Sequence, residues 1–181
     1  MSAANLRHSP TDEISTRETA AMLGAALLLE LVQLWVLPNF LQLQLILIIT
    51  LYVGWYSPPG KAAAWGTVSG LALDYLLGLF LGLNGLSKTL LGFASSYLGR
   101  WMPDEARAMR TILLFIASIV DQLMIFAILL LLGEPFPQPS LLIILLRAIG
   151  TGIVGTVFFR LYDKIRFPPT DFRRLQEGSR L

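Results

Sequence analysis

The strongest constraint on the fold of this chain is a series of long apolar runs, each bounded by proline, glycine or charged residues. The hydrocarbon core of a bilayer is about 30 Å thick, so an α-helix needs about 20 apolar residues to cross it. Proline and glycine between the runs are turn and helix-end signals, which supports the boundaries. This length predicts six membrane spans, at residues 19–37, 40–56, 62–82, 86–101, 109–132 and 140–161.

The composition also indicates a protein that resides in lipid. Hydrophobic residues make up 55% of the 181 residues and charged residues 14%, with a mean hydropathy of +0.65. Soluble domains carry about 25% charged residues. The polar tail at residues 1–18 and the basic tail at 162–181 are too short for a soluble domain, and no cleavable signal peptide is expected. We therefore predict an all-α integral membrane protein with one six-helix bundle at residues 19–161.

The distribution of basic residues predicts the orientation of the bundle, because lysine and arginine are retained on the cytoplasmic side. With six spans, twelve of the fourteen basic residues fall on one side, which places both termini in the cytoplasm. The net charge of +2 is then explained by topology, and no nucleic-acid partner is expected. Aromatic residues near the predicted span ends are expected to act as interfacial anchors: Trp35, Tyr52, Trp55, Tyr56, Trp65 and Trp101.

Several classes of enzyme site are excluded by the residue inventory. The chain has no cysteine, and His8, its one histidine, lies in the polar tail, so thiolate, zinc and histidine-dependent nucleophilic sites have no ligands or base in the membrane. Asp74 and Asp121 match no aspartyl-protease motif, and no carboxylates cluster as magnesium ligands would. We expect a noncatalytic protein without a metal or cofactor.

A stripe of glycines surrounds an aspartate in the third predicted span. Gly66, Gly70, Asp74, Gly78 and Gly82 recur every fourth residue, which on a continuous helix would place them on one face. Small residues at this spacing let another helix approach closely. The stripe therefore predicts a close helix crossing, either with a partner protein's helix or within the bundle with Asp74 as a structural hydrogen-bonding group.

Other ionisable residues lie inside the predicted spans, namely Glu30, Asp121 and Arg147. Charged groups at this depth cost about 2.5–3.5 kcal/mol each on insertion scales, so they are expected to face the bundle interior and to pair. We expect Arg147 to pair with Asp74 or Asp121, and Lys88 to extend to the outer surface. A proton or cation relay is less favoured because the acids stand singly, without broken half-helices or repeated motifs.

The segment GTVSGLALDYLLGLFLGLNGLSKTLLGFASSYLG, residues 66–99, resembles the MreD family of rod shape-determining proteins. That family typically shows an aspartate flanked by glycines, then a glycine-rich break with asparagine, then a helix rich in small residues. The matching positions in this chain are Gly70, Asp74, Gly78, Gly82, Asn84 and Gly85, with Gly92 and Gly99 in the next span.

The resemblance implies a role that composition cannot show. MreD proteins are noncatalytic partners of MreC in the bacterial elongation complex, with MreB filaments, RodA and a class B penicillin-binding protein. They act in the inner membrane and support lateral peptidoglycan synthesis and rod cell shape. Their fold is similar to the S-components of energy-coupling-factor vitamin transporters. By analogy, the stripe residues would hold the transmembrane helix of MreC or pack the bundle that does: Gly66, Gly70, Asp74, Gly78, Gly82, Asn84 and Gly85.

Two alternatives stay open. A vitamin-binding S-component would have the same length and number of spans, but it needs polar outer loops, and the first predicted outer loop is only Pro38-Asn39. A small channel or lipid-interacting protein is the other alternative, although no ring of pore-lining polar residues is apparent.

Overall fold

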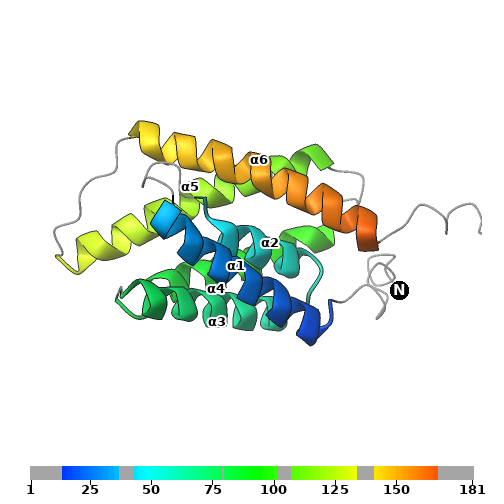
Figure 1. Cartoon of the computed structure of the whole chain (residues 1–181), viewed down its shortest axis with the longest axis horizontal. Helices are drawn as coiled ribbons and strands as arrows, with labels where there is room; N and C mark the ends of the chain where they lie inside the picture. Colours follow the sequence, from blue (N-terminus) through cyan, green and yellow to red (C-terminus); the bar gives the residue numbers. More distant parts are fainter. Residues whose placement is uncertain (1–13, 37–42, 79, 102–106, 134–140, 167–181) are drawn as a thin grey trace, which may run out of the picture.

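The computed structural model describes residues 14–36, 43–78, 80–101, 107–133 and 141–166. These residues contain helices and no strand, which confirms the predicted all-α class. Figure 1 shows α2 in the middle of the molecule, with α3 and α4 side by side on one side of it and α5 and α6 on the other. The helices are α1 (Thr16–Val36), α2 (Leu45–Trp55), α3 (Pro59–Leu77), α4 (Leu83–Trp101), α5 (Arg107–Leu131) and α6 (Leu141–Arg166).

Three of these helices are long and apolar enough to cross a membrane: Thr16–Val36, Met109–Leu131 and Leu141–Ile165. The helix α2 is apolar but has only 11 residues, which corresponds to about 16 Å. It begins at Leu45 rather than at residue 40, so its helical part is shorter than the predicted span. Six spans and their orientation stay predictions, because among the described helices three meet the length and composition of a membrane span.

The short helix α2 forms the core of the bundle. Ten of its eleven residues are buried, and it contacts every other helix among the described residues. A helix that is apolar on all sides is stable only when it is surrounded, because no face is suited to water. The sequence LILIITLYVGW therefore places α2 at the centre, where it supports both helix pairs.

The pair α3 and α4 is held together by glycines. A Cβ added at Gly66 would collide with the backbone carbonyl of Lys88, and one at Gly70 would collide with that of Asn84. One added at Gly92 would lie 2.8 Å from the carbonyl oxygen of Ala62. The glycines thus allow backbone-to-backbone contact along the whole hairpin.

We predict that Gly70→Ala will destabilise the protein by several kcal/mol, on the order of an overpacked core site, because the collision is with backbone rather than with a flexible side chain. The matched control is Gly24→Ala on α1, where nothing lies within 4 Å and the loss of glycine flexibility should be neutral or slightly stabilising. Unfolding by SDS in mixed micelles measures both. Equal stability of the two variants would contradict the close packing of α3 on α4.

The glycine stripe is shorter than predicted. The helix α3 ends at Leu77, and Gly78 follows as a left-handed cap with φ of 63°. Gly82 has φ of 105° and lies in the turn before α4. The expectation that all five positions share one helix face is therefore wrong for these two glycines, which allow the chain to reverse direction.

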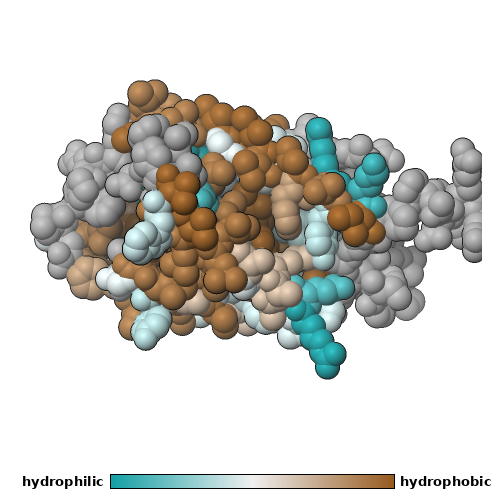
Figure 2. Space-filling model, viewed as in Figure 1, coloured by the Kyte–Doolittle hydropathy of each residue, from teal (hydrophilic) through white to brown (hydrophobic). Residues whose placement is uncertain are grey.

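Large apolar side chains cover much of the outer surface. Figure 2 shows a predominantly hydrophobic face, with hydrophilic side chains gathered near the end where α1 begins and α6 ends. Trp35 on α1 and Leu131 on α5 are 92% and 87% exposed, respectively. Such a surface is typical of a protein whose solvent is lipid.

Candidate functional site

Asp74, the aspartate of the glycine stripe, caps the N-terminus of α4. Its carboxylate accepts hydrogen bonds from the backbone N–H groups of Gly82, Asn84 and Gly85 at 2.9, 3.0 and 3.2 Å, and from the Asn84 side chain at 2.8 Å. The first N–H groups of a helix have no partner within the helix and carry partial positive charge. Asp74 is fully buried, so these four bonds stabilise its carboxylate and the end of α4 together.

Polar side chains also cap α2, whose N-terminus lies beside the interior of α1. Glu30 accepts from the Ile46 N–H at 3.1 Å, and Gln33 accepts from the Leu43 N–H at 2.9 Å. Glu30 lies about 21 Å along α1 from Thr16, at about 1.5 Å per residue. The first N–H groups of a helix have no partner within the helix, and these two side chains accept from N–H groups at the start of α2.

A buried ion pair joins α4 to α5. The Lys88 Nζ lies 3.1 Å from Asp121 and donates to the Asn84 side-chain oxygen at 2.7 Å. The Lys88 and Asp121 side chains are 3% and 1% exposed, and the Ser87 hydroxyl also donates to Asp121. The expectation that Lys88 extends to the outer surface is therefore wrong, because a carboxylate on the neighbouring helix holds it inside.

The pairing expected for Arg147 is also not what the structure shows. Asp74 is engaged by the N-terminus of α4, and the ion pair of Asp121 is with Lys88. Arg147 lies on α6 and is partly buried. Asp74 and Asp121 are fully buried, and the cation that pairs with Asp121 is Lys88.

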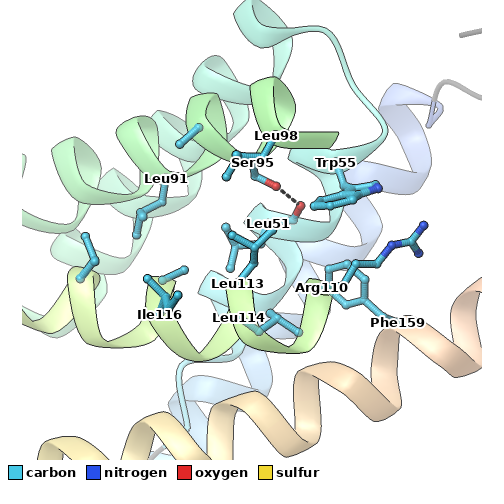
Figure 3. Close-up of a pocket in the computed structure, with 13 residues that line it drawn as sticks. Leu51, Trp55, Leu91, Ser95, Leu98, Arg110, Leu113, Leu114, Ile116 and Phe159 are labelled. Carbon is cyan, nitrogen blue, oxygen red and sulfur yellow. Dashed lines mark hydrogen bonds between the residues drawn. The ribbon is translucent and has the colours of Figure 1, made fainter. Parts of the chain in front are cut away.

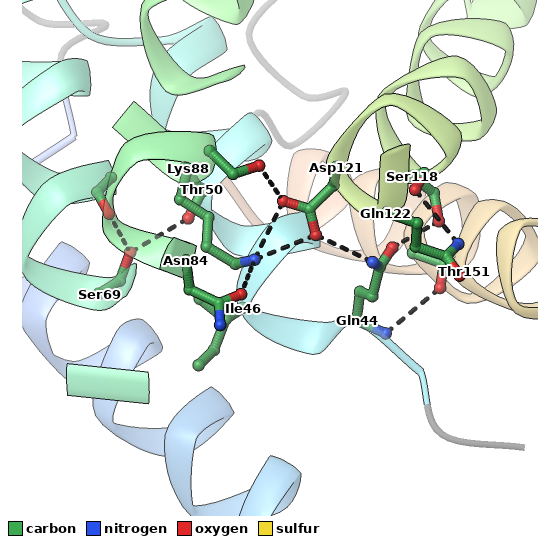
Figure 4. Close-up of polar contacts among 12 residues, drawn as sticks. Gln44, Ile46, Thr50, Ser69, Asn84, Lys88, Ser118, Asp121, Gln122 and Thr151 are labelled. Atoms are coloured by element: carbon green, nitrogen blue, oxygen red, sulfur yellow. Dashed lines mark hydrogen bonds and ion pairs between the residues drawn. The ribbon is translucent and has the colours of Figure 1, made fainter. Parts of the chain in front are cut away.

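These contacts join into a continuous chain of hydrogen bonds, which we call the polar chain (Figure 4). From Asp74 and Asn84 it passes through Lys88 to Asp121, which accepts from the Gln44 side chain at 2.9 Å. The Gln44 backbone N–H in turn donates to the Thr151 hydroxyl at 3.3 Å. The polar chain thus connects α3, α4 and α5 through the start of α2 to α6.

Two members of the polar chain, and Glu30 beside it, lie at similar distances along their helices. Asp121 is about 21 Å along α5 from Arg107, and Thr151 is about 22 Å along α6 from Arg166, at about 1.5 Å per residue. Glu30 lies at a similar distance along α1. Polar residues that are far apart in the sequence therefore lie together in the fold. Each forms a hydrogen bond there that lipid could not provide.

A second polar cluster lies near the start of α5 and the end of α6, and sequence reasoning missed it. Arg110 is 2.8 Å from Asp163, and the hydroxyls of Tyr52 and Tyr56 donate to the same carboxylate at 3.1 and 2.9 Å. The guanidinium also lies 5.1 Å from the centre of the Trp55 ring.

The expectation that these α2 aromatics are interfacial anchors is therefore wrong, since Tyr52 is fully buried and Trp55 is 5% exposed. Tyr52 and Tyr56 are four residues apart, a spacing that places side chains on the same side of a helix. This spacing is the feature of the sequence that could have indicated the cluster.

Within the described part of the chain, no group of three or more histidine, aspartate or glutamate side chains is arranged to hold a metal ion. The carboxylates of Glu30, Asp74 and Asp121 accept hydrogen bonds from helix N-termini or side chains of the bundle. Chemically, this arrangement fixes helices relative to one another.

Comparison of the chain with protein-family models, with curated proteins and with solved structures finds no match. The case for a function therefore rests on the contacts just described and on the resemblance of residues 66–99 to MreD.

Proposed function

We propose that this protein is a noncatalytic membrane scaffold of a bacterial cell elongation complex. It binds MreC, works with RodA, a class B penicillin-binding protein and MreB filaments, and supports lateral peptidoglycan synthesis and rod shape. In this proposal all six helices lie in the inner membrane, surrounded by membrane lipids, with both termini in the cytoplasm.

The observation that carries the proposal is the role of Asp74. The residues that resemble MreD are the residues that build the α3–α4 hairpin: Asp74 caps α4 through Gly82, Asn84 and Gly85. Gly70 lies against the backbone of α4 in the same hairpin. A motif devoted to holding two helices in register supports a scaffold, since a reaction or transport cycle needs a group left available.

The hairpin also favours one of the two interpretations of the glycine stripe. Gly66 and Gly70 face α4 at backbone contact, so that face has no room for the helix of another protein. In the proposal, the stripe packs the bundle and MreC docks on a different, outward apolar surface.

Deleting the gene from its own bacterium tests the proposal. We expect rod-shaped cells to become spherical and a plasmid copy of the wild-type chain to restore rods, because lateral wall synthesis would lose its scaffold. Cell width and length measured by microscopy give the readout. Rods of normal dimensions, together with lost uptake of a vitamin, would instead favour a substrate-binding S-component.

A further inference from the structure

A half-open apolar cavity lies between α4 and α5, with α2 as its floor (Figure 3). We call it the α4–α5 groove. Its volume is about 190 Å³. One side is open at Ile116, whose side chain is 48% exposed. The lining is dominated by aliphatic side chains, among them Leu51, Leu91, Ala94, Leu98, Leu113 and Ala117.

The lining of the groove offers few hydrogen-bonding groups to water. The Ser95 hydroxyl in its wall already donates to the Leu51 carbonyl at 2.7 Å, and Arg110 at its end is paired with Asp163. Apolar cavities of about 150 Å³ stay dry and take apolar guests. The lining of the groove therefore favours a hydrocarbon guest.

The two ends of the groove differ in character. One end lies at Val120 and Leu91, and Val120 precedes Asp121, the buried partner of Lys88. The other end lies at Arg110. From Arg110 to Val120 the groove extends about 15 Å along α5, at about 1.5 Å per residue. That length matches one leaflet of a hydrocarbon core about 30 Å thick.

One exposed cation, Arg100, lies near the Arg110 end of the groove. Arg100, in the last turn of α4, is exposed two residues beyond the groove residue Leu98. A mobile cation side chain at the membrane surface attracts the phosphate of an anionic lipid. The charge and the length together select a lipid whose head group lies at this end.

We propose that the α4–α5 groove binds one acyl chain of an anionic phospholipid, with its head group at Arg100. The acyl chain matches the aliphatic lining of the groove, and the head group matches the exposed cation at one end. With the proposed orientation this lipid belongs to the cytoplasmic leaflet. The inference is independent of the scaffold role, since lipid binding is measured on the isolated protein.

Native mass spectrometry of the full chain in mild detergent tests the inference, with phosphatidylglycerol as the probe. We expect one tightly held lipid and weaker binding of phosphatidylcholine with the same chains. Ala117→Leu fills the groove and should lower phosphatidylglycerol affinity at least tenfold. Ala127→Leu, an exposed alanine of α5 outside the groove, is the matched control and should leave affinity unchanged.

A second groove variant, Ala94→Leu on α4, gives the same test if Ala117→Leu does not fold. Arg100→Gln should remove the preference for phosphatidylglycerol while leaving chain binding intact. Equal lipid affinity of the groove variants and Ala127→Leu would show annular lipid only and would overturn the inference. A preference for phosphatidylglycerol that survives Arg100→Gln would overturn the assignment of the head group.

Discussion

Replacing Asp74 with leucine should lower the free energy of unfolding by about 3–5 kcal/mol, because it leaves the buried N–H donors of Asn84 and Gly85 and the partly buried one of Gly82 without an acceptor. Removing a helix N-cap alone costs about 0.5–2 kcal/mol. The absence of water in the bilayer raises the penalty. Unfolding by SDS in mixed micelles measures the loss.

Two control variants separate the cap from general damage to α3. Tyr75→Leu changes the neighbouring residue, which is 78% exposed, and should cost little. Asp74→Asn keeps one acceptor oxygen and should fall between the wild type and Asp74→Leu. If the protein is the proposed scaffold, Asp74→Leu should also fail to restore rod shape, whereas Tyr75→Leu should restore it. Wild-type stability of Asp74→Leu would contradict the capping role.

The second large effect concerns the ion pair of Lys88 and Asp121. Removing one member, as in Lys88→Met or Asp121→Leu, should cost about 3–5 kcal/mol, because the remaining charge stays buried without its counter-ion. The double variant should be less destabilised than the sum of the two single changes by about 2–3 kcal/mol, since residues in one network are coupled.

A double-mutant cycle under the same conditions measures this coupling. The matched control cycle combines Lys88→Met with Tyr75→Leu, an exposed residue of α3 that should add independently. Strict additivity of Lys88→Met and Asp121→Leu would contradict the pairing.

The all-α class followed from the apolar runs, because their length and their proline and glycine boundaries are local signals. The residue at which α2 begins could not be predicted from such local signals. The helix begins where Glu30, Gln33 and Thr151 accept hydrogen bonds from the N–H groups of Ile46, Leu43 and Gln44, respectively. Those partners are distant in sequence, so no local pattern reveals them.

The candidate site could also be predicted from the sequence only in part. That Asp74 has hydrogen-bond partners could be predicted, since a carboxylate in an apolar run needs a partner. Its partner could not, because spacing by four assumes a continuous helix, and Gly78 ends α3 first. The position of Lys88 near the start of a predicted span indicates an exposed side chain. Only the fold shows that Asp121 lies beside it.

The most direct test of the proposed scaffold is mass spectrometry of the proteins that co-purify with the tagged chain from its own membranes in a mild detergent. We predict recovery of MreC, together with RodA and its penicillin-binding partner. Recovery of paired ATPases with a transmembrane coupling protein and a small-molecule ligand would contradict the scaffold and identify a vitamin-binding subunit.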